Sequence, residues 1–292
     1  MGPMPMSRRS GRWRHAAPSP ERVLAQLALR ALTPALPLAR RFGLLQESVA
    51  LWSRGLRQRK AWAEHHARCR RLVAEVAAEL PQHRKAVILG SGFLRDIPLN
   101  ALCQGFDEVV LVDIVHLPPV RLRLLPRRNV RLLTSDLTGA MAWLAGEAEG
   151  RADPLAGLIA DEAVDLVVSA NLLSQLAWPV ADWLEDHPAR AAALPSDMPA
   201  RCIAWHLDDL SRFKGHVCLI SDVEMVERER DGAIHDRLDL TYGVKLPPED
   251  ESWLWPVAPF GEAERDREFV HKVCAWRDFQ GSRSPRLASV ED

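Results

Sequence analysis

Short apolar runs alternate with longer amphipathic stretches between residues 83 and 222 of this chain of 292 residues. The runs are rich in Val, Ile and Leu, and they occupy residues 86–89, 108–112, 129–133, 164–169 and 216–220. Such runs predict buried strands, and the helical stretches between them predict a sheet covered on both faces. We therefore predict an α/β fold with a doubly wound, mostly parallel sheet.

The pattern changes after residue 222. Asp231-Gly232 separates two extended stretches at 223–230 and 233–240, which predicts a hairpin. Residues 269–276 predict one further strand, so we expect seven strands in all, with an antiparallel C-terminal strand. Two segments rich in proline and acidic residues, 182–199 and 245–264, are expected to be long loops.

Helices are predicted ahead of the first strand. Ser19-Pro20-Glu21 has the order of residues that begins a helix, and apolar side chains recur every three or four residues from Trp62 to Leu80. The chain is divided as follows: a disordered basic tail at 1–20, a basic helical extension at 21–82, a Rossmann-like domain at 83–280 and a flexible tail at 281–292.

Charge is unevenly distributed along the chain, although its formal net charge is only -1. Residues 1–85 carry 17 Lys or Arg against 5 Asp or Glu, so the rest of the chain is acidic. The basic region could contact anionic lipid or nucleic acid, solvate a helix face, or dock on the chain's own acidic domain.

Cysteine spacing and hydropathy indicate the compartment. The five cysteines are far apart and form no CxxC pair, so the sequence predicts neither a disulfide framework nor a zinc knuckle. No apolar run approaches the ~18 residues that a membrane-spanning helix needs. We expect a cytoplasmic protein without a transmembrane segment.

The most informative motif is Gly90-Ser91-Gly92, which follows the run at 86–89. Gly90 can adopt a positive φ, Gly92 allows a ligand to approach the backbone, and the next helix would offer free N–H groups to an anion. An ordinary turn after a strand has the same pattern.

Polar residues also end the next three strands. Asp113 follows the glycines by about 20 residues, where a carboxylate could accept hydrogen bonds from ribose hydroxyls, and Asp136 could accept one from an exocyclic amine. Either acid could instead cap a helix. The run at 164–169 brings Ser169 and Asn171 to the same edge of the sheet.

In this order of parts, residues 83–280 resemble the class I S-adenosylmethionine-dependent methyltransferases. The resemblance implies that Gly90 and Gly92 pass under the methionine part of the cofactor, that Asp113 holds the ribose and that Asp136 contacts adenine. The segment from Ser169 would then face the methyl donor and acceptor.

The glycine motif departs from that family, whose motif usually begins with an acid and ends with a third glycine. Here Ile88 and Leu94 stand in those places. Asp96 could compensate by holding the amino group of the cofactor's methionine. The resemblance implies methyl transfer from S-adenosylmethionine to an unidentified small molecule.

Nucleic-acid bases are disfavoured as acceptors because Ser-Ala-Asn-Leu, at 169–172, lacks the proline and the aromatic ring that hold a flipped base. Two alternatives stay open: an NAD(P)-dependent oxidoreductase, which Arg95 in place of a third glycine disfavours, and a non-catalytic scaffold.

No catalytic residue is assigned. The candidate general bases are Asp222, Glu224, His206, His235 and Tyr242, of which His206 is expected to be a packed helix residue. Trp253, Trp255 and Phe260 could line an acceptor site or belong to the core.

Overall fold

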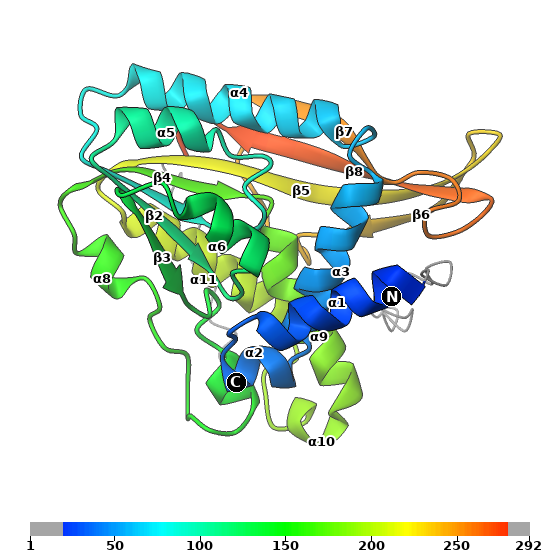
Figure 1. Cartoon of the computed structure of the whole chain (residues 1–292). Helices are drawn as coiled ribbons and strands as arrows, with labels where there is room; N and C mark the ends of the chain where they lie inside the picture. Colours follow the sequence, from blue (N-terminus) through cyan, green and yellow to red (C-terminus); the bar gives the residue numbers. More distant parts are fainter. Residues whose placement is uncertain (1–19, 280–292) are drawn as a thin grey trace.

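The computed structural model describes residues 20–279, with side chains from residue 23 onward. Its strands are β1 (Lys85–Leu89), β2 (Glu108–Asp113), β3 (Val130–Thr134), β4 (Val164–Ala170), β5 (His216–Glu229), β6 (Ile234–Asp239), β7 (Glu251–Ala258) and β8 (Arg267–Trp276). They form one sheet in the order β3-β2-β1-β4-β5-β8-β7, and β6 pairs with β5. The first five strands are parallel, whereas β6, β7 and β8 pair in antiparallel fashion (Figure 1). The predicted fold class is confirmed.

Helices cover both faces of the sheet. They are α1 (Pro20–Leu32), α2 (Pro37–Arg41), α3 (Leu44–Arg57), α4 (Ala63–Glu79), α5 (Leu99–Gly105), α6 (Pro118–Leu124), α7 (Met141–Leu144), α8 (Ala156–Ile159), α9 (Leu173–Asp186), α10 (Pro188–Ala191) and α11 (Met198–Arg212). Buried side chains of α4, α5 and α6 pack on one face, and those of α7, α8, α9 and α11 pack on the other. The central strands are apolar along most of their length because both of their faces are buried.

The C-terminal part differs from the prediction in two respects. The sheet has one strand more than the seven expected, because β7 lies in the segment 245–264 that was predicted to be a loop. Pro256 and the flanking acids obscure the alternation of this strand, in which Trp253 and Trp255 are buried while Leu254 is exposed. The other predicted loop, 182–199, contains the end of α9 and all of α10.

The remaining C-terminal predictions are confirmed. The stretches 216–220 and 223–230 are one strand, β5, with an irregular register between Asp222 and Glu224. Its far half forms the predicted hairpin with β6, with Gly232 in the turn. The run at 269–276 is β8, and it is antiparallel to β5.

The N-terminal helices pack on the sheet domain. Helix α4 buries Cys69, Val73 and Val76, as its apolar spacing predicted. Helix α3 lies within the predicted helical extension at 21–82, although the sequence gave it no boundaries of its own. Residues of α2 and α3 pack against Val115 and Leu117, which follow β2 at the carboxyl edge of the sheet. The predicted tail at 281–292 and almost all of that at 1–20 lie outside the described residues, and the domain boundaries remain predictions.

Two classes of site are not found within residues 20–279. No helix there is both long and apolar enough to cross a bilayer. No group of three or more His, Cys, Asp or Glu side chains in that range could hold a metal ion.

Candidate functional site

The glycine turn after β1 is joined to the end of β2. Gly90 and Gly92 have φ of +71° and +48°, which glycine adopts without strain. The Gly90 and Ser91 amides donate to the Val112 carbonyl oxygen, at 2.9 and 3.1 Å. The Gly92 amide donates to Asp113 Oδ2 at 2.7 Å. The structure therefore brings together the glycine motif and the first acid that the sequence singled out.

A second contact joins the loops after β1 and β4. Asn171 Nδ2 donates to Asp96 Oδ2 at 2.8 Å, and the Asn171 backbone has a φ of +54°. Burial raises the pKa of the Asp96 carboxyl, and the hydrogen bond from Asn171 opposes this effect. The sequence placed both residues near the cofactor, but it gave no sign that they bond to each other.

Two buried polar atoms beside these contacts have no hydrogen-bond partner among the described residues. They are Ser91 Oγ and Asn171 Oδ1. Buried polar atoms are nearly always hydrogen-bonded, so these two are available to a polar ligand or to water. A hydroxyl can donate or accept, and an amide oxygen can accept from an ammonium group.

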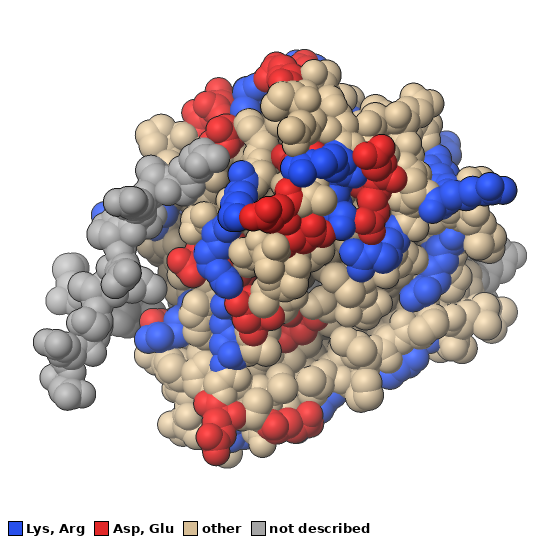
Figure 2. All heavy atoms as spheres, turned by 90° about the vertical axis from the view of Figure 1, so that its left-hand side faces the viewer, with Lys and Arg blue, Asp and Glu red and all other residues tan. Residues whose placement is uncertain are grey.

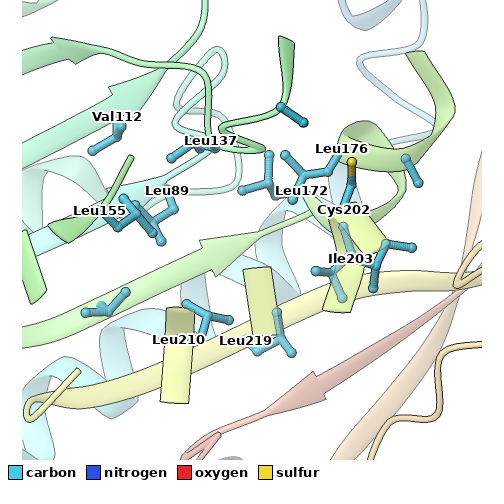
Figure 3. Close-up of a cluster of buried hydrophobic side chains, with 14 of the residues drawn as sticks. Leu89, Val112, Leu137, Leu155, Leu172, Leu176, Cys202, Ile203, Leu210 and Leu219 are labelled. Carbon is cyan, nitrogen blue, oxygen red and sulfur yellow. The ribbon is translucent and has the colours of Figure 1, made fainter. Parts of the chain in front are cut away.

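The two glycines differ in the space beside them. A Cβ on Gly90 would lie 2.9 Å from Leu172 Cδ1, whereas a Cβ on Gly92 would have only the Gly90 carbonyl oxygen nearby, at 3.8 Å. Leu172 belongs to a buried cluster with Leu137 and Leu176 (Figure 3). A ligand at this turn therefore fits on the Gly92 side, and Leu172 fills the space beside Gly90.

Asp136 forms hydrogen bonds within its own turn. Its Oδ1 accepts from the Thr138 amide at 3.0 Å and from Thr138 Oγ1 at 2.6 Å, and its Oδ2 accepts from the Met141 amide at 2.9 Å. Asp239, at the end of β6, accepts from the amide and the hydroxyl of Thr241 in the same way. Both acids begin an Asp-Leu-Thr sequence, so this set of bonds is a local turn that forms with or without a ligand nearby.

The hydroxyl of Ser169 is directed toward α11. It lies 2.9 Å from His206 Nε2, and both side chains are fully buried. Burial lowers the pKa of His206 to about 3, so this imidazole is neutral at physiological pH. His206 is a packed helix residue, as the sequence predicted.

A buried Ser-Asp-His group lies at the carboxyl edge, near the end of β4. Ser174 Oγ donates to Asp222 Oδ1 at 2.8 Å, and His271 Nδ1 lies 2.7 Å from Asp222 Oδ2. Burial acts to raise the pKa of Asp222, but the bonds from His271 and Ser174 outweigh it and the pKa is lowered. His271 Nε2 has no partner among the described residues.

The sequence named Asp222 but missed His271. The two are 49 residues apart, and only the antiparallel pairing of β5 with β8 brings them together. An isolated histidine within a predicted strand gave no signal of this contact.

The tryptophans of β7 belong to the core. Trp253 Nε1 donates to His65 Nδ1 at 3.1 Å, and the His65 ring stacks on Trp255 with centroids 4.0 Å apart. Burial lowers the pKa of His65 to about 3. Phe260 instead contacts the guanidinium of Arg230, which lies 4.8 Å from the centroid of the Phe260 ring.

The other candidate bases lie along the β5–β6 hairpin or just after it. Glu224 accepts a hydrogen bond from Arg237 at 2.6 Å, and His235 Nδ1 is 3.4 Å from Glu229. Tyr242 follows β6, and burial raises the pKa of its hydroxyl. None of the three has a described contact with the glycine turn.

Helix α3 covers the glycine turn from outside the sheet. Trp52 packs edge-on against Phe93 with centroids 5.1 Å apart, and the Arg95 guanidinium lies 5.5 Å from the Trp52 ring centroid. Arg95 also donates to the Gly55 carbonyl oxygen. The N-terminal extension is therefore part of the wall of the candidate site.

No protein-family profile and no curated protein matches the chain. Among solved structures, DhpI in complex with SAM and HEP is 14% identical, with 82% of this chain and 99% of that chain covered and a TM-score of 0.36. The 1,6-didemethyltoxoflavin-N1-methyltransferase of Burkholderia thailandensis is 15% identical, with coverages of 89% and 91% and a TM-score of 0.35.

A third match is the putative methyltransferase crystallised with the Trm112 methyltransferase activator of Haloferax volcanii. It is 16% identical, with a TM-score of 0.31. The match covers 58% of this chain and 56% of that one.

Proposed function

We propose that this chain is an S-adenosylmethionine-dependent methyltransferase that acts on a small molecule. The observation that carries the proposal is the 2.7 Å hydrogen bond from the Gly92 amide to Asp113 Oδ2. It joins a strand-turn motif suited to close backbone approach with the carboxylate suited to ribose hydroxyls. Such a pairing of loops supports a single nucleoside ligand that touches both.

The described residues fit the cofactor on the Gly92 side of the turn. Ser91, Asp96 and Asn171 offer polar atoms to the methionine part, two of them without a partner in the fold. Asp113 would hold the ribose, and Asp136 would lie at the adenine end, with Gly90 shaping the turn and Ser169 supporting it from β4. S-adenosylmethionine, when bound, supplies an electrophilic methyl group.

The Asp222–His271 pair is suited to take a proton from the acceptor. Asp222 is placed to accept the Nδ1 hydrogen of His271, and a neutral imidazole would then carry its lone pair on Nε2, which is the unpartnered atom. The carboxylate would stabilise the imidazolium once Nε2 is protonated. Asp222 lies two residues after Ile220, whose carbonyl oxygen accepts a hydrogen bond from the backbone amide of Asn171 at 2.8 Å. This favours acceptors that carry an N–H or O–H group.

Specific features of the fold bear on the two alternatives, an NAD(P)-dependent oxidoreductase and a non-catalytic scaffold. A dinucleotide-binding sheet continues with a sixth parallel strand, whereas here the antiparallel β8 follows β5. The scaffold alternative is favoured by Leu172 against Gly90 and by the cover that α3 provides, since both restrict access to the turn.

Calorimetric titration of the full chain with S-adenosylmethionine, its demethylated product and NAD tests the proposal. We expect the first two to bind, and Asp113→Ala to weaken binding by about 100-fold because hydrogen bonds to a charged group are lost. Asp239→Ala is the matched control, since it removes a carboxylate that also binds backbone amides at a strand end. Binding of NAD alone, or of none of the three, would refute the proposal.

A further inference from the structure

The outward face of α1 is apolar. Val23, Leu24, Leu27 and Leu32 are 38%, 67%, 51% and 70% exposed, and the exposed alanines at 25, 28 and 31 lie among them. None of these side chains is polar, although a surface helix normally turns its polar face to water. We call these side chains, together with Leu36 just beyond the helix, the α1 strip.

The inward face of α1 holds the helix in this orientation. Gln26 Nε2 donates to Ser53 Oγ of α3 at 3.1 Å, and Leu29 packs against the cluster formed by α2, α3 and the segment after β2. Figure 1 shows α1 on the outside of the N-terminal helices. The packing therefore fixes the polar Gln26 on the inside and the leucines on the outside.

Exposed apolar strips of this kind mark a surface that binds another protein or a membrane. Charge indicates which molecule covers it, because the described residues 23–41 contain three arginines and no acid. In the described part, Arg40 is exposed and Arg41 pairs with Glu147 at 2.9 Å. Leucines beside an excess of positive charge match a bilayer with anionic headgroups, which takes up apolar side chains and attracts cations.

A second copy of the chain fits this surface less well. Two copies that met through their α1 strips would bring together two segments, residues 23–41 of each copy, that each carry an excess of three positive charges. A membrane-spanning role is excluded for α1, because its 13 residues are shorter than the ~20 that cross a bilayer.

We propose that α1 lies in the interface of an anionic membrane, with the leucines of its strip among the lipid chains and the arginines at the headgroups. Each basic residue near such a surface strengthens binding by a factor of about five, and each buried leucine does so by a similar factor or more. Together they anchor the chain reversibly at the membrane surface.

Sedimentation of the full chain with vesicles tests this proposal. We expect binding to vesicles of phosphatidylcholine with phosphatidylserine, weak binding to phosphatidylcholine alone, and release by high salt. The Leu24→Ser/Leu27→Ser double variant should bind at least about tenfold more weakly. Leu254→Ser is the matched control, since Leu254 is 66% exposed but lies on β7, and this variant should bind like the wild type.

Three results would overturn the proposal. The wild type could fail to bind either kind of vesicle, or the double variant could bind as well as the wild type, which would leave the basic charges alone responsible. Analytical ultracentrifugation without lipid could also show a dimer that the double variant loses, which would make a second copy the occupant. Circular dichroism would verify that both variants keep their helix content.

Discussion

Polar side chains at the amino edge of the parallel strands differ from those at the carboxyl edge in how completely they are paired. At the amino edge a cavity of about 350 Å³ is lined by apolar residues such as Leu80 and Val164 and by four charged side chains that form two ion pairs. Arg84 bonds to Asp165 at 2.5 Å, and Lys214 bonds to Glu162 at 2.6 Å. On the side of the molecule seen in Figure 2, positive and negative side chains lie next to one another.

At the carboxyl edge the polar groups are buried and incompletely paired. Ser91 Oγ, Asn171 Oδ1 and His271 Nε2 have no partner among the described residues. Exposed ion pairs contribute little to stability, whereas a buried polar atom without a partner is costly unless something else binds it. The polar groups at the amino edge are therefore already satisfied by one another, whereas those at the carboxyl edge have atoms left to bind a ligand or water.

The largest effect is expected from breaking the buried pair at the carboxyl edge. Asp222→Ala should lower the free energy of unfolding by about 3–5 kcal/mol, because it leaves His271 and Ser174 buried without their acceptor. Asp222→Asn keeps one acceptor oxygen and should cost less. Urea denaturation measures both, and a wild-type midpoint for Asp222→Ala would show that the group is not a stabilising contact.

The next largest effect is expected from acid, which should lower the free energy of unfolding by protonating His206, which the fold buries, in the unfolded chain. His206 has a pKa of about 3 in the fold against 6.5 for the free side chain, so the unfolded chain binds the proton more readily. Its contribution is complete above pH 6.5 and is lost as the pH falls toward 3, which amounts to about 2 kcal/mol between pH 7 and pH 5. His206→Gln should make the pH dependence of unfolding shallower by that amount, and parallel curves for variant and wild type would contradict this.

The smallest effect is expected at the amino edge. Lys214→Ala removes an ion pair whose two side chains are 73% and 77% exposed. Its urea midpoint and its affinity for S-adenosylmethionine should equal those of the wild type within experimental scatter, because solvent screens such a pair. A clear loss of cofactor affinity would reverse our choice of edge.

Several elements could be predicted because the cause is local. The buried runs that became β1, β2 and β4 consist mostly of apolar residues, and the turn at Asp231-Gly232 has its own sequence signature. Asp113 was found because its distance from the glycines reflects the length of one helical crossover. Each of these signals lies within one stretch of sequence.

Other features depend on contacts that no single stretch contains. His271 acquires its partner only through the register of β5 and β8, and Leu172 reaches Gly90 from a loop after a different strand. For Asp136 the signal is local but does not identify a role. Asp239 makes the same Asp-Leu-Thr turn at the end of β6, so an acid at a strand end can be a turn residue as well as a ligand-binding one. Sequence could place these side chains on an edge, but it could not say what they touch.

Strand β6 has a consequence for how concentrated samples of this protein behave. It pairs only with β5 among the described strands, so its other edge presents unpaired backbone groups of the kind that template stacking of chains. Its exposed side chains include His235, Asp236 and Arg237. Charges of both signs on so short an edge oppose the addition of a further strand, so this end of the sheet is protected against fibril growth.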